Sequence, residues 1–245
     1  MSTKLENQVA VLELSIYNFF FQQIFDIDID NMTYELQIIK KEDHKDVVDF
    51  VRKNFMKDEP INRAINLITE EKPINEELEN FLLRDYASGK SLKVIQNGNI
   101  IAVCISSILE KNHTEDDSVI KSENKDFNTI VNFLSYVDKQ SDPFKKFPKS
   151  NRAISVGIMA VHSNYRGMGI AGRMLDKTWE LGKEQKCDFM TVECSSYFTA
   201  RALEKLGFEQ IYRLNYEEYK VNGEIVFKTE PPHVASTVYV KEIKS

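Results

Sequence analysis

Apolar and polar positions recur along the chain with two periods, one typical of helices and one typical of strands. In residues 42–56 the apolar positions fall three and four residues apart and so share one helical face; they are Val47, Val48, Val51 and Phe55. In residues 92–109 two apolar runs instead surround Asn97-Gly98, a pair that favours a tight turn between antiparallel strands. The pattern therefore predicts a helix in the first segment and a hairpin in the second.

The rest of the chain alternates between the same two patterns. Strands are expected at residues 33–41, 153–161, 189–194, 209–214 and 236–240, and helices at residues 75–89, 127–137, 172–186 and 198–206. Residues 9–29 are the most apolar stretch, but polar residues interrupt it, so we expect a helix that is packed on the body or loosely attached, with a membrane-surface role as the alternative, rather than a membrane span or a signal peptide. We therefore expect an N-terminal extension over residues 1–32 and a single α/β domain over residues 33–245.

Composition and charge narrow the function. The 245 residues include 32 Lys and Arg against 38 Asp and Glu, a net charge of −6, which disfavours a nucleic-acid-binding protein that relies on bulk positive charge. Cys104, Cys187 and Cys194 form no Cys-x-x-Cys pair, and only four histidines are present. This pattern indicates neither a disulfide framework nor a zinc site, so we expect no metal and a cytoplasmic location.

Glycines are concentrated at the start of one predicted helix. Three of the nine, Gly167, Gly169 and Gly172, lie within six residues of each other. Amides at a helix start are unpaired donors at the positive end of the helix dipole, and small residues let a phosphate approach the backbone. A phosphate-bearing ligand is therefore expected here, with a tight turn that binds no ligand as the alternative.

Two familiar phosphate-binding motifs fit this loop poorly. It lacks the Gly-Lys-Ser/Thr of a Walker loop. It does read Gly-x-Gly-x-x-Gly, and Glu193, at a strand end 21 residues after Gly172, stands where a dinucleotide-binding fold has its ribose-binding acid. However, the polar segment 162–166 separates the loop from its strand, and only 73 residues follow Gly172. Both observations count against a dinucleotide site.

Arg166 stands ahead of the glycines and completes the pattern Gln/Arg-x-x-Gly-x-Gly/Ala. Here the chain resembles the GNAT superfamily of N-acetyltransferases, which bind the pyrophosphate of coenzyme A with this loop; Ala200–Glu209 is similar to their last helix. The resemblance implies an α/β fold, the GNAT fold with a mixed central sheet flanked by helices, and acetyl-CoA as co-substrate. It implies cofactor-binding roles for Met159, Ala160, Val161, Arg166, Gly167, Met168, Gly169, Ile170, Ala171 and Gly172.

Three segments extend the resemblance to the insect arylalkylamine N-acetyltransferases of the dopamine N-acetyltransferase type. They are Lys57–Asn62, Cys194–Phe208 and Gly223–Val234. The resemblance implies transfer of acetyl to the primary amine of dopamine, tyramine, serotonin or a similar arylalkylamine, by direct attack in a ternary complex. The partners would then be a small-molecule amine and acetyl-CoA, and we expect a monomer without an integral membrane segment.

Such a reaction needs a group that takes a proton from the ammonium form of the amine, whose pKa is about 10. A carboxylate performs this step if burial raises its pKa, or through a water relay. Glu59 matches the general base of the family, and its neighbour Asp58 is the alternative. The resemblance also implies catalytic hydroxyls at Ser195 and Thr199 and a cofactor contact at Ser196.

Several further expectations depend on the tertiary structure. Leu203 occupies the position of the tyrosine that many superfamily members use to protonate the leaving thiolate. A backbone N–H in residues 158–161 is expected to stabilise the oxyanion where the strand separates from its neighbour. Asn62 is expected to cap a helix, and Phe55 and residues 142–147 to line the amine pocket. The alternatives are a polyamine or other small-amine acetyltransferase, a peptide acetyltransferase, and a non-catalytic acyl-CoA-binding module.

Overall fold

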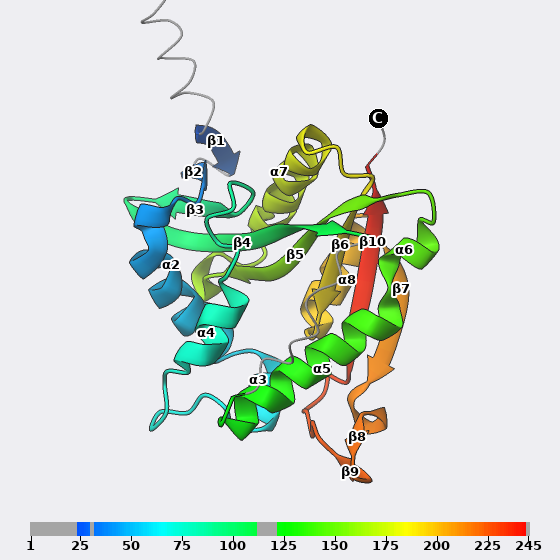
Figure 1. Ribbon diagram of the computed structural model, residues 1–245. Helices are drawn as coiled ribbons and strands as arrows, with labels where there is room; N and C mark the ends of the chain where they lie inside the picture. The colour runs from blue at the N-terminus through cyan, green and yellow to red at the C-terminus, as the bar shows by residue number, and fades with distance from the viewer. Residues whose placement is uncertain (1–23, 30–31, 112–121, 244–245) are drawn as a thin grey trace, which may run out of the picture.

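An eight-stranded sheet, ordered β1-β2-β3-β4-β5-β6-β10-β7, runs through the computed structural model, which describes residues 24–29, 32–111 and 122–243 (Figure 1). All neighbouring strands pair antiparallel except β5 and β6, which are parallel. The strands are β1 (Ile24–Ile29), β2 (Met32–Ile38), β3 (Leu92–Gln96), β4 (Asn99–Glu110), β5 (Arg152–Val161), β6 (Phe189–Cys194), β7 (Glu209–Asn215) and β10 (Ala235–Glu242); β8 (Lys220–Val221) and β9 (Glu224–Ile225) form a separate hairpin.

Helices cover both faces of the sheet. Helices α7 and α8 lie on one face and α2, α4 and α5 on the other (Figure 1). Their apolar side chains belong to the two main core clusters, one for each face. The helical segments are η1 (Lys41–Asp43), α2 (His44–Val51), the π-helical turn η2 (Arg52–Met56), α3 (Pro60–Ala64), α4 (Glu76–Leu82), α5 (Lys125–Ser141), α6 (Pro143–Lys146), η3 (Ser163–Tyr165), α7 (Ile170–Glu184), α8 (Tyr197–Lys205) and η4 (Tyr216–Glu218). The central strands of the sheet therefore lie between two layers of helices.

The periodicity of the sequence predicted most of these elements. The hairpin β3–β4 turns at Asn97 and Gly98, whose φ angles of 49° and 76° are the left-handed values that a two-residue turn of this kind requires. Val47 and Val51 are fully buried on the predicted helical face. The helix over residues 42–56 is nevertheless divided, because α2 ends at Val51 and the chain continues as the wider turn η2.

Two expectations about the helices were wrong. The helix expected over residues 75–89 ends at Leu82, after seven residues. The helix expected over residues 9–29 lies mostly outside the described residues, and its last six residues form strand β1, paired with β2. The sequence Ile-Phe-Asp-Ile-Asp-Ile alternates apolar and acidic residues, which suits a strand. The sheet therefore begins inside the segment expected to be an extension. In the part of the chain that is described, no helix has the length and apolar character needed to cross a bilayer.

The parallel strands β5 and β6 separate after a short pairing. Their register runs from Ala153 opposite Phe189 to Val156 opposite Val192 and stops, although β5 continues to Val161. Gly157 is an extra residue in β5, because Val156 pairs with Ser106 and Ile158 pairs with Ile105 in β4. Such a β-bulge bends the strand that contains it. The second half of β5 therefore no longer pairs with β6, although it still pairs with β4.

Candidate active site

A cavity of about 1560 Å³ opens where β5 and β6 separate. Its volume exceeds the roughly 300–1,000 Å³ of a pocket for one drug-sized ligand, so two substrates have room to bind together. Two groups of lining residues carry the chemistry. We call Arg166, Gly167, Gly169, Ile170, Ala171 and Gly172 the loop wall, and Glu59, Asp138 and Glu193 the acidic wall.

The loop wall presents backbone donors at the start of α7. Gly169 is the N-cap of this helix with φ 76°, and Gly167 has φ 81°. Both values favour glycine, and nothing lies within 4 Å of the place where a Cβ would stand on either residue. No side chain caps α7, so its first amides have no side-chain acceptor and point their dipole at the cavity. This geometry suits a pyrophosphate.

Arg166 connects the loop wall to the turn before α3. Its Nε donates a hydrogen bond of 3.0 Å to the carbonyl of Val161, and its Nη2 donates one of 3.2 Å to Oδ2 of Asp58. Both side chains of the ion pair are about half exposed. Exposed ion pairs typically contribute about 0–1 kcal/mol, so a phosphate competes readily for this guanidinium.

The residues predicted to contact the cofactor are brought together, with one qualification at Met168. Met159, Ala160 and Val161 line the cavity beside the loop wall. The Met168 side chain instead packs against the core, and the Tyr34 hydroxyl donates to its sulfur at 3.6 Å. Only the backbone of Met168 therefore remains available to a ligand on the loop.

Two amides of β5 face the gap that β6 leaves. The N–H of His162 donates to the carbonyl of Ile101 in β4. Because successive amides of a strand point to opposite edges, the N–H groups of Met159 and Val161 point to the edge from which β6 has departed. They are the candidate donors to an oxyanion.

Glu59 is held by the irregular backbone between η2 and α3. Its N–H donates to the carbonyl of Phe55 at 2.9 Å, and Pro60 follows as the first residue of α3. Asn62 does not cap a helix as expected: it lies inside α3, 2% exposed, and its Nδ2 donates to the carbonyl of Met56. Asn62 therefore fixes the turn that carries Glu59.

The Glu59 carboxyl group has the properties of a base poised near neutral pH. The residue is 9% exposed, and its Oε1 has no hydrogen-bond partner among the residues that the structure describes. Burial raises the pKa of Glu59 to about 7, while hydrogen bonding to the Ser195 side chain and to the Ile61 backbone opposes the rise. Asp58, the alternative, is exposed and paired with Arg166. Both neighbours line the cavity, but of the two only Glu59 is buried there.

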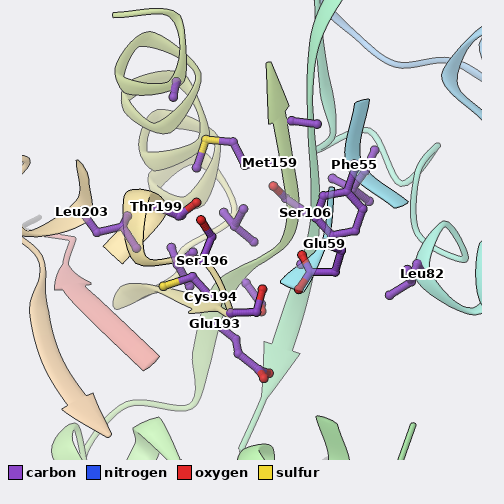
Figure 2. Close-up of a pocket in the computed structure, with 18 of the residues that line it drawn as sticks. Phe55, Glu59, Leu82, Ser106, Met159, Glu193, Cys194, Ser196, Thr199 and Leu203 are labelled. Atoms are coloured by element: carbon purple, nitrogen blue, oxygen red, sulfur yellow. The ribbon is translucent and has the colours of Figure 1, made fainter. Parts of the chain in front are cut away.

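The three predicted hydroxyl residues line the cavity, and the Ser195 side chain is hydrogen-bonded to the Glu59 carboxyl group. Figure 2 shows Ser196 and Thr199 on the side opposite Glu59. Ser196 is the N-cap residue of α8, but its hydroxyl accepts no hydrogen bond from the helix, so it is free to contact a ligand. The carbonyl of Ser195 accepts a 2.9 Å hydrogen bond from the hydroxyl of Tyr216.

Two further residues, Leu203 and His233, line the cavity without adding an acid. Leu203 lies in α8 and is fully buried, and its aliphatic side chain has no proton to deliver to a thiolate. The Nδ1 atom of His233 accepts from the Tyr197 N–H at 3.3 Å. Burial, and then the charge of Arg63, lower the pKa of His233, which favours its neutral form.

The aromatic lining differs from the one expected. Phe55 lines the cavity together with Phe81 and Phe133. Of residues 142–147, Pro143 lines the cavity as expected, but Phe144 and Phe147 instead pack against Phe189, at ring-centroid distances of 5.3 and 4.4 Å, so the role expected of these two rings was wrong. They cover an apolar patch of the sheet, which periodicity alone does not distinguish from a pocket wall.

Residues 58–208 match the acetyltransferase (GNAT) family, and the chain belongs to this family. Its fold is the GNAT fold, its co-substrate is acetyl-CoA, and it is an acyltransferase. The resemblance seen in the glycine loop is confirmed.

Solved structures extend this result. Arylalkylamine N-acetyltransferase 2 from Aedes aegypti is 27% identical over 86% of this chain and 99% of that chain, with a TM-score of 0.79. Two more distant structures show the shared fold alone. They are the Drosophila melanogaster polyamine N-acetyltransferase, described as catalysing the formation of N-acetylagmatine (20% identity, 85% and 99% coverage, TM-score 0.76), and the NatC complex bound to Gag peptide and CoA (13% identity, 86% and 99% coverage, TM-score 0.52).

Proposed function

We propose that the protein transfers the acetyl group of acetyl-CoA to the primary amine of an arylalkylamine, by direct attack in a ternary complex. The observation that carries the proposal is Glu59, a buried carboxyl group with an unpartnered oxygen in a cavity lined by Phe55 and Phe133. The 27% identity to the Aedes aegypti arylalkylamine N-acetyltransferase 2 supports the same substrate class.

On the donor side, the amides of Gly167 to Gly172 and the Arg166 guanidinium bind the pyrophosphate. The pantetheine arm then extends along residues 159–161, toward the separation of β5 and β6. There the N–H groups of Met159 and Val161 polarise the thioester carbonyl and stabilise the oxyanion that forms.

On the acceptor side, Glu59 removes a proton from the ammonium group, so that the neutral nitrogen attacks the thioester carbon. The C–N bond forms, the tetrahedral intermediate collapses, and the C–S bond breaks. The second proton of the nitrogen is lost, and the thiolate of coenzyme A takes up a proton to become the free thiol. Ser195 and Thr199 are the hydroxyl groups proposed to assist at the sulfur.

Direct transfer is supported by the state of the nearest thiol. Cys194 lines the cavity, but burial raises the pKa of its thiol to about 12, and its sulfur lies 3.2 Å from Oγ1 of Thr237. Such a thiol is a poor nucleophile at neutral pH. The three cysteines are buried and free, which also supports the proposed cytoplasmic location.

The test is thiol release from acetyl-CoA with three kinds of acceptor: tyramine, dopamine and serotonin; polyamines; and short peptides. We expect the highest kcat/KM with the aromatic amines. Turnover confined to polyamines or peptides would mean that the protein is an acetyltransferase of a different substrate class. Binding of coenzyme A without thiol release for any acceptor would leave a non-catalytic acyl-CoA-binding module.

A further inference from the structure

Glu193 places a second carboxyl group in the cavity that contains Glu59. Its neighbours in β6, Val192 and Cys194, pack in the core beneath α7 and α8. Alternate side chains of a strand face opposite sides, so Glu193 points away from α8, toward the side covered by α5. It lines the cavity, and its Oε1 accepts a hydrogen bond from Oγ of Ser236 at 3.4 Å (Figure 2). The acetyl-transfer steps above do not use this group.

The surroundings of Glu193 are acidic. Burial contributes most to raising its pKa well above the usual range, and the charges of Asp138 and Glu59 raise it further; only the hydrogen bond from Ser236 opposes the rise. Among the ion pairs formed between described residues, none includes Glu59 or Glu193. Together with the buried Oε1 of Glu59, which has no hydrogen-bond partner among the described residues, this leaves two carboxyl groups in the cavity without an ion-pair partner there, although Arg63, Arg84, Lys90, Arg166 and Lys205 also line it.

The chemistry of the site selects the kind of ligand. A buried carboxylate is costly unless a charge pairs with it, so a cationic ligand gains more from Glu193 than a neutral one. The described residues contain no group of three His, Cys, Asp or Glu side chains arranged to hold a metal ion, which favours an organic cation. An ammonium or guanidinium group supplies both the charge and the hydrogen-bond donors.

We propose that Glu193 is a specificity-determining residue that binds a second cationic group of the acceptor amine, at the end opposite the nitrogen that is acetylated. The proposal rests on the proposed acetyl transfer, since Glu59 receives the reacting nitrogen. Among aliphatic acceptors of similar size, the enzyme then discriminates by the charge at the far end, and a diamine or a guanidino-amine is preferred over the matching monoamine; the aromatic amines of the proposed function lack this charge and contact the phenylalanines instead.

The test compares two acceptors with the same carbon chain, pentylamine and 1,5-diaminopentane, in the wild type and in Glu193→Gln. Hydrogen bonds to charged groups correspond to roughly tenfold or more in affinity, so the ratio of kcat/KM for the diamine to kcat/KM for the monoamine is expected to fall by about that factor in the variant. Glu184→Gln removes the same charge from an exposed position in α7 and is expected to keep the wild-type ratio. An unchanged ratio in Glu193→Gln overturns the proposal.

Two further measurements cover the cases in which Glu193→Gln does not fold or the wild type shows no activity. Glu193→Asp retains the charge on a shorter side chain, so its preference should move toward 1,6-diaminohexane; this variant decides the matter if Glu193→Gln does not fold. If the wild type releases no thiol with any amine, the proposed function fails, and calorimetric binding of the two acceptors then tests the subsite alone. Tighter binding of the diamine that is lost in Glu193→Gln supports the subsite, and equal binding of both acceptors rejects it.

Discussion

The loop wall and the acidic wall of the cavity are built in different ways. The loop wall comes from one continuous segment and acts through backbone amides, whose direction is set by left-handed glycines and the start of α7. The acidic wall comes from three segments far apart in sequence, and two of its side chains, Glu59 and Glu193, act through burial, whereas Asp138 is exposed. A local motif therefore suffices to create a phosphate site, whereas the acid–base chemistry exists only after the chain has folded.

The neighbours Asp58 and Glu59 show the same difference within two residues. Asp58 is exposed and joins the loop wall through Arg166. Glu59 is buried, and its pKa is raised to about 7. Identical functional groups thus acquire different roles because one remains in water and the other does not.

The largest expected effect is on the acidic wall. Glu59→Gln removes the proposed base, and kcat/KM at pH 7 is expected to fall by about 10²–10⁴-fold, the usual contribution of general base catalysis. In the wild type, kcat/KM should rise with pH through about 7 as Glu59 ionises. Asp58→Asn is the matched control and should cost far less. An equal loss in both variants would mean that negative charge near the loop, rather than proton removal by Glu59, is what the reaction requires.

The same substitution should change the pH dependence of stability. The pKa of Glu59 rises from 4.5 to about 7 on folding, so the associated stability is present below pH 4.5 and is lost as the pH rises through 7. A shift of this size corresponds to about 3 kcal/mol. Between pH 4 and pH 9, Glu59→Gln should therefore gain about that much free energy of unfolding relative to the wild type. Parallel denaturant titrations measure it, and a pH-independent difference between the two proteins would contradict the burial of the carboxylate.

A smaller effect is expected on the loop wall. An alanine at Gly169 must adopt the left-handed conformation, at about 1–2 kcal/mol, so the KM for acetyl-CoA in Gly169→Ala should rise by about tenfold. Gly98→Ala imposes the same strain in the β3–β4 turn, outside the cavity, and should lower stability without raising this KM. Steady-state kinetics with varied acetyl-CoA compares the two. A rise of KM in both would show that the effect comes from general destabilisation.

Periodicity predicted the elements better than it predicted the interruptions between them. The hairpin at Asn97-Gly98 and strand β6 follow from local patterns of apolar and turn residues. The bulge at Gly157 and the π-helical turn η2 do not, because each is fixed by what its segment packs against rather than by its own sequence. These two irregularities open the cavity and carry the chain to Glu59.

The sequence by itself determined the glycine loop, the alternation of strands and helices, and the family, because each depends on residues close together in the chain. It also singled out Glu59, through its resemblance to a family motif. Only the tertiary structure decided that Glu59 is buried beside Ser195 and that Glu193 lines the same cavity as Glu59. Burial and electrostatic coupling arise from groups that folding brings together, so no local pattern specifies them.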